Sequence, residues 1–261
     1  MAADDGTQSF WDHLDTLRTV IVQALAISMS LGVVAFCFKD QLFAVVLAPA
    51  DSDFITYRVL RTVSSLTGDD MTASDVRLIN TGVARQLIIH MRTALAAGAL
   101  CASPYVVYLL FRFVSPALYD NERRYAVRVA GGGYVMFGVG VLVSYFIVFP
   151  LTFRFLGTYQ VSADVTNMIT LDSYMSTLAV MCTALGIVFE IPVVAWLLAK
   201  LGLLTARRMR RYRKHAVVAE LCVAAVITPT SDIFTLLLVA LPMALLYEAS
   251  ILIVTHADTW Q

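Results

Sequence analysis

The chain has 261 residues, of which 59% are hydrophobic and only 15% are charged, and its mean hydropathy is +0.76. Soluble domains carry about 25% charged residues, so this composition indicates a membrane protein. The formal net charge is zero, which argues against a nucleic-acid partner because such a partner requires a basic excess.

Residues 1–19 are predicted to form a cytoplasmic amphipathic helix that leads into the first span. Four acidic residues stand where a cleavable signal peptide would be basic: Asp4, Asp5, Asp12 and Asp15. One helical face carries the apolar residues Phe10, Leu14, Leu17 and Ile21. A simple extension of the first span also accounts for this pattern, so both interpretations remain open.

Six apolar stretches follow in the order Val20–Phe38, Thr93–Phe111, Val129–Phe153, Tyr174–Ala199, Ala216–Ile227 and Ile233–Val254. A spanning helix needs about 20 residues, and the first four stretches reach that length. Glu220 interrupts the fifth stretch, and both Pro242 and Glu248 interrupt the sixth. Both glutamates lie near span ends, Glu220 six residues after Lys214, so solvation at the membrane interface is expected. We therefore expect one all-α polytopic membrane domain over residues 1–261, in which helices five and six are short.

The long polar segment over residues 39–86 is predicted to form a cap of two or three short helices on the outer face. Pro49 follows the apolar piece DQLFAVVLAP, and a proline there should end that helix. In the third stretch, Gly131–Gly133, Gly138 and Gly140 favour close helix packing over a nucleotide loop, because no strand precedes them.

Basic residues concentrate in two short loops, which predicts that both termini are cytoplasmic. The loop after the second stretch contains Arg112, Arg123, Arg124 and Arg128. The loop after the fourth contains Lys200, Arg207, Arg208, Arg210, Arg211, Arg213 and Lys214. This second run is either a topology signal alone or also a binding surface for anionic lipid.

Glu190 lies in an apolar run that has no other charge between Asp172 and Lys200. A carboxylate at membrane depth needs a partner or a function. Residues four positions away on either side are not cations, so no partner is available on the same helix. Pro192 should kink the helix beside it. The pair therefore predicts a functional site within the fourth span.

The short inner loop FRFVSPALYDNERRYAVR offers a second candidate site. Pro116 should end one helix, and Glu122 should lie in the first turn of the next. An exposed carboxylate there suits an arginine-bearing ligand, because the two groups form charge-assisted hydrogen bonds. Local pairing with Arg123, Arg124 or Arg128 is the alternative. By contrast, Asp232 precedes the sixth helix, where an N-cap role accounts for it.

The combined motifs resemble the TatC family, the polytopic core of the twin-arginine protein translocase. They cover about residues 10–250 and comprise WDHLDTLR, Pro49, SPYVVYLLFRFVSPALYDNERR, Phe149–Pro150, FEIP at Phe189–Pro192, TPTSD and ALPMALLYE. The resemblance implies six transmembrane helices in a concave, cup-like wall within the bacterial cytoplasmic membrane. It also implies a receptor for twin-arginine signal peptides that exports folded proteins using the proton-motive force. TatA-like and TatB-like single-span proteins, further copies of the chain and membrane lipids are the implied partners.

The resemblance assigns signal-peptide binding to Glu122, with Phe113 and Pro116 shaping its loop and Arg18 belonging to the N-terminal motif. The glutamate of that motif is replaced here by Thr16, so Asp12 or Asp15 is expected to supply the second carboxylate. Glu190 matches the intramembrane glutamate, which is expected to contact a partner helix. Pro49, Pro192 and Asp232 match structural or functional turns of the family.

An ion- or proton-coupled transporter of a small solute is the alternative function, with Glu190 as its relay. Transporters usually place interrupted helices at equivalent positions of two repeats, whereas this sequence has no visible repeat. Four cysteines, Cys37, Cys101, Cys182 and Cys222, lie in or beside apolar segments without metal-ligand spacing. No catalytic motif stands out either, so we expect neither an enzyme nor a bound metal or cofactor.

Overall fold

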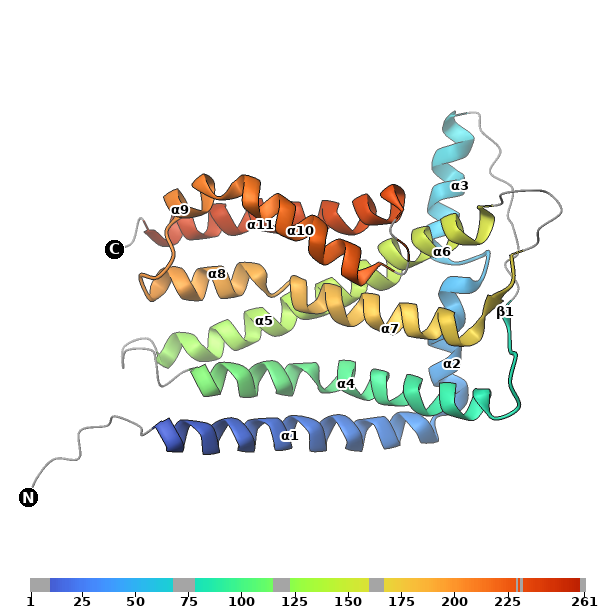
Figure 1. Ribbon diagram of the computed structural model, residues 1–261, viewed down its shortest axis with the longest axis horizontal. Coiled ribbons are helices and arrows are strands. Elements are labelled where there is room, and N and C mark those ends of the chain that lie inside the picture. Colours follow the sequence, from blue (N-terminus) through green and yellow to red (C-terminus); the bar gives the residue numbers. More distant parts are fainter. Residues whose placement is uncertain are drawn as a thin grey trace, which may run out of the picture.

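The computed structural model describes residues 10–67, 78–114, 123–159, 167–228, 230 and 232–258. Long helices run side by side through most of the molecule, and shorter elements cross one end of them (Figure 1). We call that end, which contains α2 (Lys39–Leu47), α3 (Ile55–Thr67) and two short strands, the cap end. The opposite end, where α1 begins and α11 ends, is the terminal end.

Five spans in the described part of the chain are long and apolar enough to cross a membrane. The first two lie within α1 (Phe10–Cys37) and α4 (Arg85–Val114). The third joins α5 (Arg123–Val143), the π-helical segment η4 (Ser144–Val148) and α6 (Phe149–Thr158). The fourth joins α7 (Leu171–Val188) to α8 (Ile191–Lys200), and the last lies within α11 (Ile233–Asp258). The predicted all-α class is therefore confirmed in outline.

The fifth predicted helix is short, as expected, but the sixth is not. After the short α9 (Ala206–Arg211), α10 (Arg213–Ile227) has 15 residues, which is short as predicted. The prediction for the sixth was wrong, since α11 runs unbroken for 26 residues with Pro242 inside it. A proline removes only one backbone donor, and a membrane helix tolerates this when it packs on neighbours. Both Val239 and Met243 beside the proline are buried in the core.

Glu248 also fails to interrupt α11, because its carboxylate lies 2.6 Å from the guanidinium of Arg213 on α10. Glu220 also differs from the prediction. Its distance from the basic loop predicted a solvated side chain, yet it is buried, with 8% of its surface exposed. Packing of α10 against α11 encloses this residue, and the sequence separation from Lys214 gave no indication of that contact.

The cap is built as predicted from short helices, and α2 ends two residues before Pro49. Pro49 lies in η1 (Ala48–Ala50). Tyrosines from three other elements donate to backbone carbonyls of η1 or of the last turn of α2 before it. Tyr145 of η4 donates to Val45 O at 2.6 Å, and Tyr174 of α7 donates to Val46 O at 2.9 Å. We call these two residues and Tyr57 of α3 the tyrosine clamp.

Tyr57 completes the clamp by donating to two prolines, with oxygen distances of 3.1 Å to Pro49 O and 2.9 Å to Pro150 O. Burial raises the pKa of Tyr57 to about 12, although the guanidinium of Arg154, 5.4 Å from the ring centre, acts in the opposite direction. The hydroxyl therefore remains a donor across the whole physiological pH range. The clamp fixes η1 against α3, α7 and the third span.

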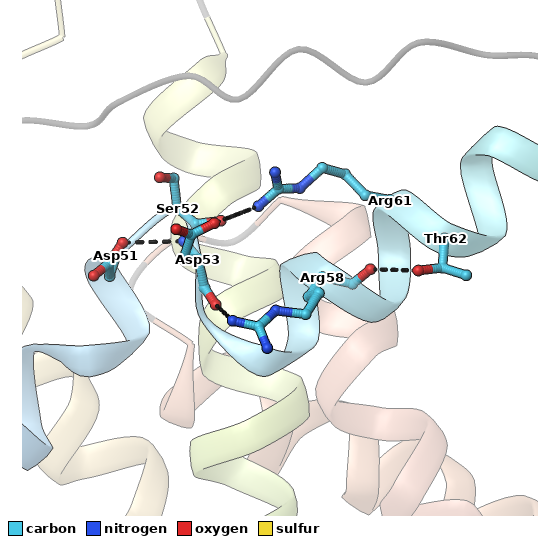
Figure 2. A network of polar contacts seen from close by, with 6 residues as sticks. All are labelled: Asp51, Ser52, Asp53, Arg58, Arg61 and Thr62. Carbon is cyan, nitrogen blue, oxygen red and sulfur yellow. Dashed lines mark hydrogen bonds and ion pairs between the residues drawn. The ribbon is translucent and has the colours of Figure 1, made fainter.

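Polar contacts hold the connection from η1 into α3 (Figure 2). Arg61 donates to Ser52 O at 2.6 Å and to a carboxylate oxygen of Asp53 at 3.1 Å. Arg58 donates to Asp53 O at 3.3 Å, and the Asp53 amide donates to the Asp51 carboxylate at 3.0 Å. These bonds satisfy backbone groups that lie between the two helices.

A two-residue parallel pairing was not predicted. β1 (Leu78–Ile79) pairs with β2 (Ile169–Thr170) and so joins the segments that precede α4 and α7. Asp172, in the first turn of α7, lies 2.7 Å from the guanidinium of Arg85 and 3.7 Å from that of Arg92. The cap ends of α4 and α7 are thus joined by backbone hydrogen bonds between the two strands and by ion pairs to Asp172.

Candidate functional site

The fourth span breaks at Phe189–Glu190, between α7 and α8 (Figure 1). Pro192 has no amide hydrogen, so it cannot donate to the carbonyl of residue 188 as a continuous helix requires. The Glu190 amide bonds Ile187 O at 3.0 Å, and its carbonyl accepts from the Val194 amide at 2.9 Å. The predicted interruption beside Pro192 is confirmed. Glu190 occupies the N-cap position of α8, but its side chain makes no capping hydrogen bond.

The Glu190 carboxylate lies against the backbone of α5. A methyl group placed on Gly133 would be 2.9 Å from Glu190 Oε2, 2.9 Å from the Phe111 ring and 3.1 Å from Val107. Only glycine leaves room for the carboxylate here. We call this space, bounded by Gly133, Phe111 and Val107, the Gly133 niche.

Both carboxylate oxygens of Glu190 are buried, and neither has a hydrogen-bond partner among the residues that the structure describes. The described part of the chain contains no lysine or arginine paired with it. Burying an unpaired polar group costs about 1–3 kcal/mol or more. A proton, or a hydrogen-bond donor from outside the described residues, would therefore stabilise the buried carboxylate of Glu190.

A cavity of about 470 Å³ adjoins this break on the side of α8, α9 and α11. Glu190 lines it together with apolar residues of α8, and Arg208, Tyr212 and Tyr247 add polar groups. We call it the α8–α11 cavity. It gives the break an open side, whereas the Gly133 niche is closed.

Three of the residues predicted to bind a signal peptide, Asp15, Arg18 and Phe113, lie toward the terminal end, where α1 begins and α4 ends (Figure 1). Asp15 and Arg18 are exposed on α1, and Phe113 is half-buried in the last turn of α4. Asp12 lies on α1, but its side chain is outside the described residues. Glu122 and Pro116 fall in residues 115–122, which lie wholly outside the described part of the chain. Helix α1 runs unbroken from Phe10, so residues 10–19 continue directly into the span.

Asp232 caps α11, as its position predicted. Its carboxylate accepts from the Thr235 amide at 2.8 Å and from the hydroxyls of Thr230 and Thr235. Slight burial acts to raise the pKa of Asp232, but these hydrogen bonds together hold it below its usual range. The residue lies beside the cap end of α11, away from the break in the fourth span, and its contacts are those of a structural cap.

Sequence reasoning missed two parts of the site. The run Gly131–Gly133 indicated close packing, but only the third glycine has described atoms within 4 Å of an added methyl group. Which glycine faces Glu190 depends on the rotation of α5, which apolar periodicity does not fix. The cavity was also missed because its lining comes from α8, α9 and α11, which are joined only by tertiary packing.

Comparisons with known proteins give a consistent result. A family model described as "Sec-independent protein translocase protein (TatC)" matches residues 12–242. A protein of that name from Aquifex aeolicus is 32% identical over 244 residues, covering 92% of each chain. Another, from Desulforapulum autotrophicum, is 31% identical over 253 residues, covering 97% of this chain and 86% of its own.

A solved structure is similar as well. A crystal structure described as the twin arginine translocase receptor TatC superposes with a TM-score of 0.76 and 31% sequence identity. The match covers 94% of this chain and 99% of that one. The likeness therefore extends over nearly the whole chain.

Proposed function

The chain belongs to the TatC family of Sec-independent protein translocase proteins, and on that premise we propose that it is the signal-peptide receptor and assembly core of a twin-arginine translocase. Its task is then the export of folded proteins across the bacterial cytoplasmic membrane. The observation that carries the proposal is the full-length likeness to a structure described as the twin arginine translocase receptor. Family membership disfavours the alternative of a small-solute transporter.

The proposed topology has six crossings, with α10 as the fifth, and both termini in the cytoplasm. The 15 residues of α10 span about 22 Å, against a hydrocarbon core of about 30 Å. A short helix is accommodated by local thinning of the bilayer. The arginines of α9 lie at the terminal end, and basic loops favour the cytoplasmic side. Such a helix set forms the concave wall that the family implies.

Recognition of the arginine pair is assigned to the terminal end. Glu122 and one of Asp12 and Asp15 would bind the two guanidinium groups, with Arg18, Phe113 and Pro116 shaping the surface. Supporting this, Asp15 is exposed on the first turns of α1, at the same end as the last turn of α4. Carboxylates bind guanidinium groups in a bidentate geometry that a lysine cannot reproduce.

Glu190 is proposed to contact the transmembrane helix of a TatA-like or TatB-like partner. Its oxygens have no hydrogen-bond partner among the described residues, and the break frees backbone from regular helix geometry. A polar side chain on a partner helix would satisfy the carboxylate. Contact requires the side chain to rotate out of the Gly133 niche toward the open side of the break.

The test compares co-purification of a twin-arginine precursor with three forms of the full chain. Glu122→Gln should abolish binding, because an amide keeps the shape but loses the charge that pairs with arginine. Asp232→Asn is the matched control, since asparagine also caps helices well and should leave binding largely intact. Precursor bound equally by the wild type and the Glu122 variant would refute the receptor assignment.

A second arm tests Glu190. Photocrosslinking groups placed at positions 122 and 190 should give different products with precursor and single-span partners present. We expect position 122 to crosslink to the precursor alone and position 190 to a partner or to the distal signal peptide. The reverse distribution would overturn the division of roles.

A further inference from the structure

The α8–α11 cavity is an apolar channel that is open along one side and has an arginine at its terminal end. Its walls include Ile191, Val194 and Leu198 of α8. Glu190 lies at the start of α8, and Leu198 lies eight residues later, which corresponds to about 12 Å along the helix axis. The Leu204 amide bonds Leu198 O at 3.2 Å, so the chain that leads into α9 lines the terminal end of the channel.

The mouth of the channel at the terminal end is cationic. Arg208 and Tyr212 line it, and both are exposed. Arg208 donates one N–H to Leu203 O at 2.8 Å, which leaves other guanidinium donors available. Around it, α9 carries Arg207, Arg210 and Arg211, and the first turn of α10 carries Arg213 and Lys214.

Acidic residues do not balance this charge within the described part of the chain. Glu248 pairs with Arg213 at 2.6 Å, while Arg210 donates to the hydroxyl of Thr255 at 3.1 Å. No described carboxylate is within ion-pair distance of Arg208. At the inner end, Glu190 turns its carboxylate toward Gly133 on α5. The mouth therefore favours an anionic group, and the channel behind it favours an apolar chain.

The dimensions of the channel favour a narrow extended chain over a helix as the occupant of its interior. A volume of about 470 Å³ over a length of about 12 Å gives a mean cross-section of roughly 40 Å². A helix with side chains is about 10–12 Å across and needs roughly twice that area. A signal-peptide arginine is disfavoured too, because the mouth is cationic. An extended acyl chain is narrow enough to enter.

We propose that the α8–α11 cavity binds one acyl chain of an anionic phospholipid, whose phosphate pairs with Arg208 beside Tyr212. Basic pockets at the ends of membrane helices are suited to such headgroups, and the volume lies within the range of ligand sites, about 300–1,000 Å³. The lipid would occupy the open side of the break in the fourth span. A partner helix that contacts Glu190 would then have to displace its chain.

The test measures phospholipid binding to the purified full chain by native mass spectrometry in a non-ionic detergent. Dioleoyl phosphatidylglycerol is the anionic probe, and dioleoyl phosphatidylcholine has the same chains without net charge. We expect one tight phosphatidylglycerol site. Because a charge-assisted hydrogen bond is worth about 1.5–3 kcal/mol in general, Arg208→Gln should weaken it about 10–100-fold. Arg207→Gln, on the same helix but outside the cavity lining, should change it less than about twofold.

Two further variants separate pocket binding from surface attraction. Arg208→Lys keeps the charge and should retain most of the affinity, whereas Val194→Trp fills the channel and should remove the tight site while α9 keeps all its charges. Equal losses in the Arg207 and Arg208 variants would overturn the proposal in favour of diffuse attraction. It would also be overturned by unchanged binding in the Val194 variant, or by inorganic phosphate competing at the affinity of the lipid. None of these outcomes depends on precursor binding at Glu122.

Discussion

Replacing Gly133 with alanine tests whether the carboxylate of Glu190 is held in the Gly133 niche. The new methyl group would lie 2.9 Å from Glu190 Oε2 and from the Phe111 ring, and 3.1 Å from Val107. Contacts this short force neighbouring side chains to move, and overpacking of this kind costs about 1–3 kcal/mol. Alanine also favours a helix over glycine by about 0.5–1 kcal/mol, so the net effect of one variant alone is ambiguous.

Gly138→Ala on the same helix removes that ambiguity. No described atom lies within 4 Å of a methyl group at this position, so this variant gains helix propensity without overpacking. The propensity gain is common to both variants and cancels in their difference. We expect the Gly133 variant to have an unfolding free energy about 1–3 kcal/mol lower than that of the Gly138 variant. Unfolding by sodium dodecyl sulfate in mixed micelles, followed by circular dichroism, measures this difference.

A double-mutant cycle then identifies the carboxylate as the colliding group. In a Glu190→Ala background the clash with Oε2 is absent, so Gly133→Ala should cost less by an interaction energy of about 0.5–3 kcal/mol. Any residual cost reports the contacts with Phe111 and Val107. Equal unfolding free energies for the Gly133 and Gly138 variants, or a cycle with no interaction energy, would refute the described position of the carboxylate.

Three other substitutions have defined outcomes in the same unfolding assay. Gly98→Ala should destabilise the chain by about 1–3 kcal/mol, because its methyl group would collide with the backbone of Gly32. Tyr174→Phe loses the hydrogen bond to Val46 O and should lower the unfolding free energy by about 1 kcal/mol. An unchanged unfolding free energy would show that this bond of the tyrosine clamp does not stabilise the chain. Asp232→Ala loses an N-cap and should cost about 0.5–2 kcal/mol. Because its folded-state pKa is lowered, this penalty should be full above about pH 4 and should shrink as the pH falls below it.

Local signals in the sequence predicted the positions where helices begin and end. Pro49 and Asp232 act through their own backbone or through residues three positions away, so tertiary structure is not needed to interpret them. Pro192 marked the break in the fourth span for the same reason. The resemblance to a family supplied the roles of these residues, which local signals do not contain.

The features that the sequence did not predict depend on tertiary packing. Pro242 has the same local chemistry as Pro192, yet α11 continues through it because its neighbours are buried against the core. The burial of Glu220 and the position of Glu190 beside Gly133 depend on how α10 and α5 are rotated about their axes. The pairing of Leu78 with Ile169 joins residues far apart in the sequence. Such contacts leave no periodic pattern.

The tyrosine clamp also determines where the wall can move. Hydrogen bonds hold only within about 0.5 Å of their normal length, so α7 and the third span cannot separate at the cap end without breaking the bonds of Tyr145 and Tyr174. We therefore expect the helices to tilt about the cap end, which would act as a pivot. A tilt of about 10° around it would displace the far end of a span about 30 Å long by roughly 5 Å.

Motion that admits a cargo is therefore expected to grow from the cap end toward the terminal end. Nitroxide labels at Tyr134 and Val194, which are exposed on α5 and α8, should show a broad distance distribution that shifts on precursor binding. Labels at Phe146 and Val180, exposed beside the clamp, should show a narrow one that does not shift. Under the proposed function, the helices would then separate at the terminal end while the cap end stays closed.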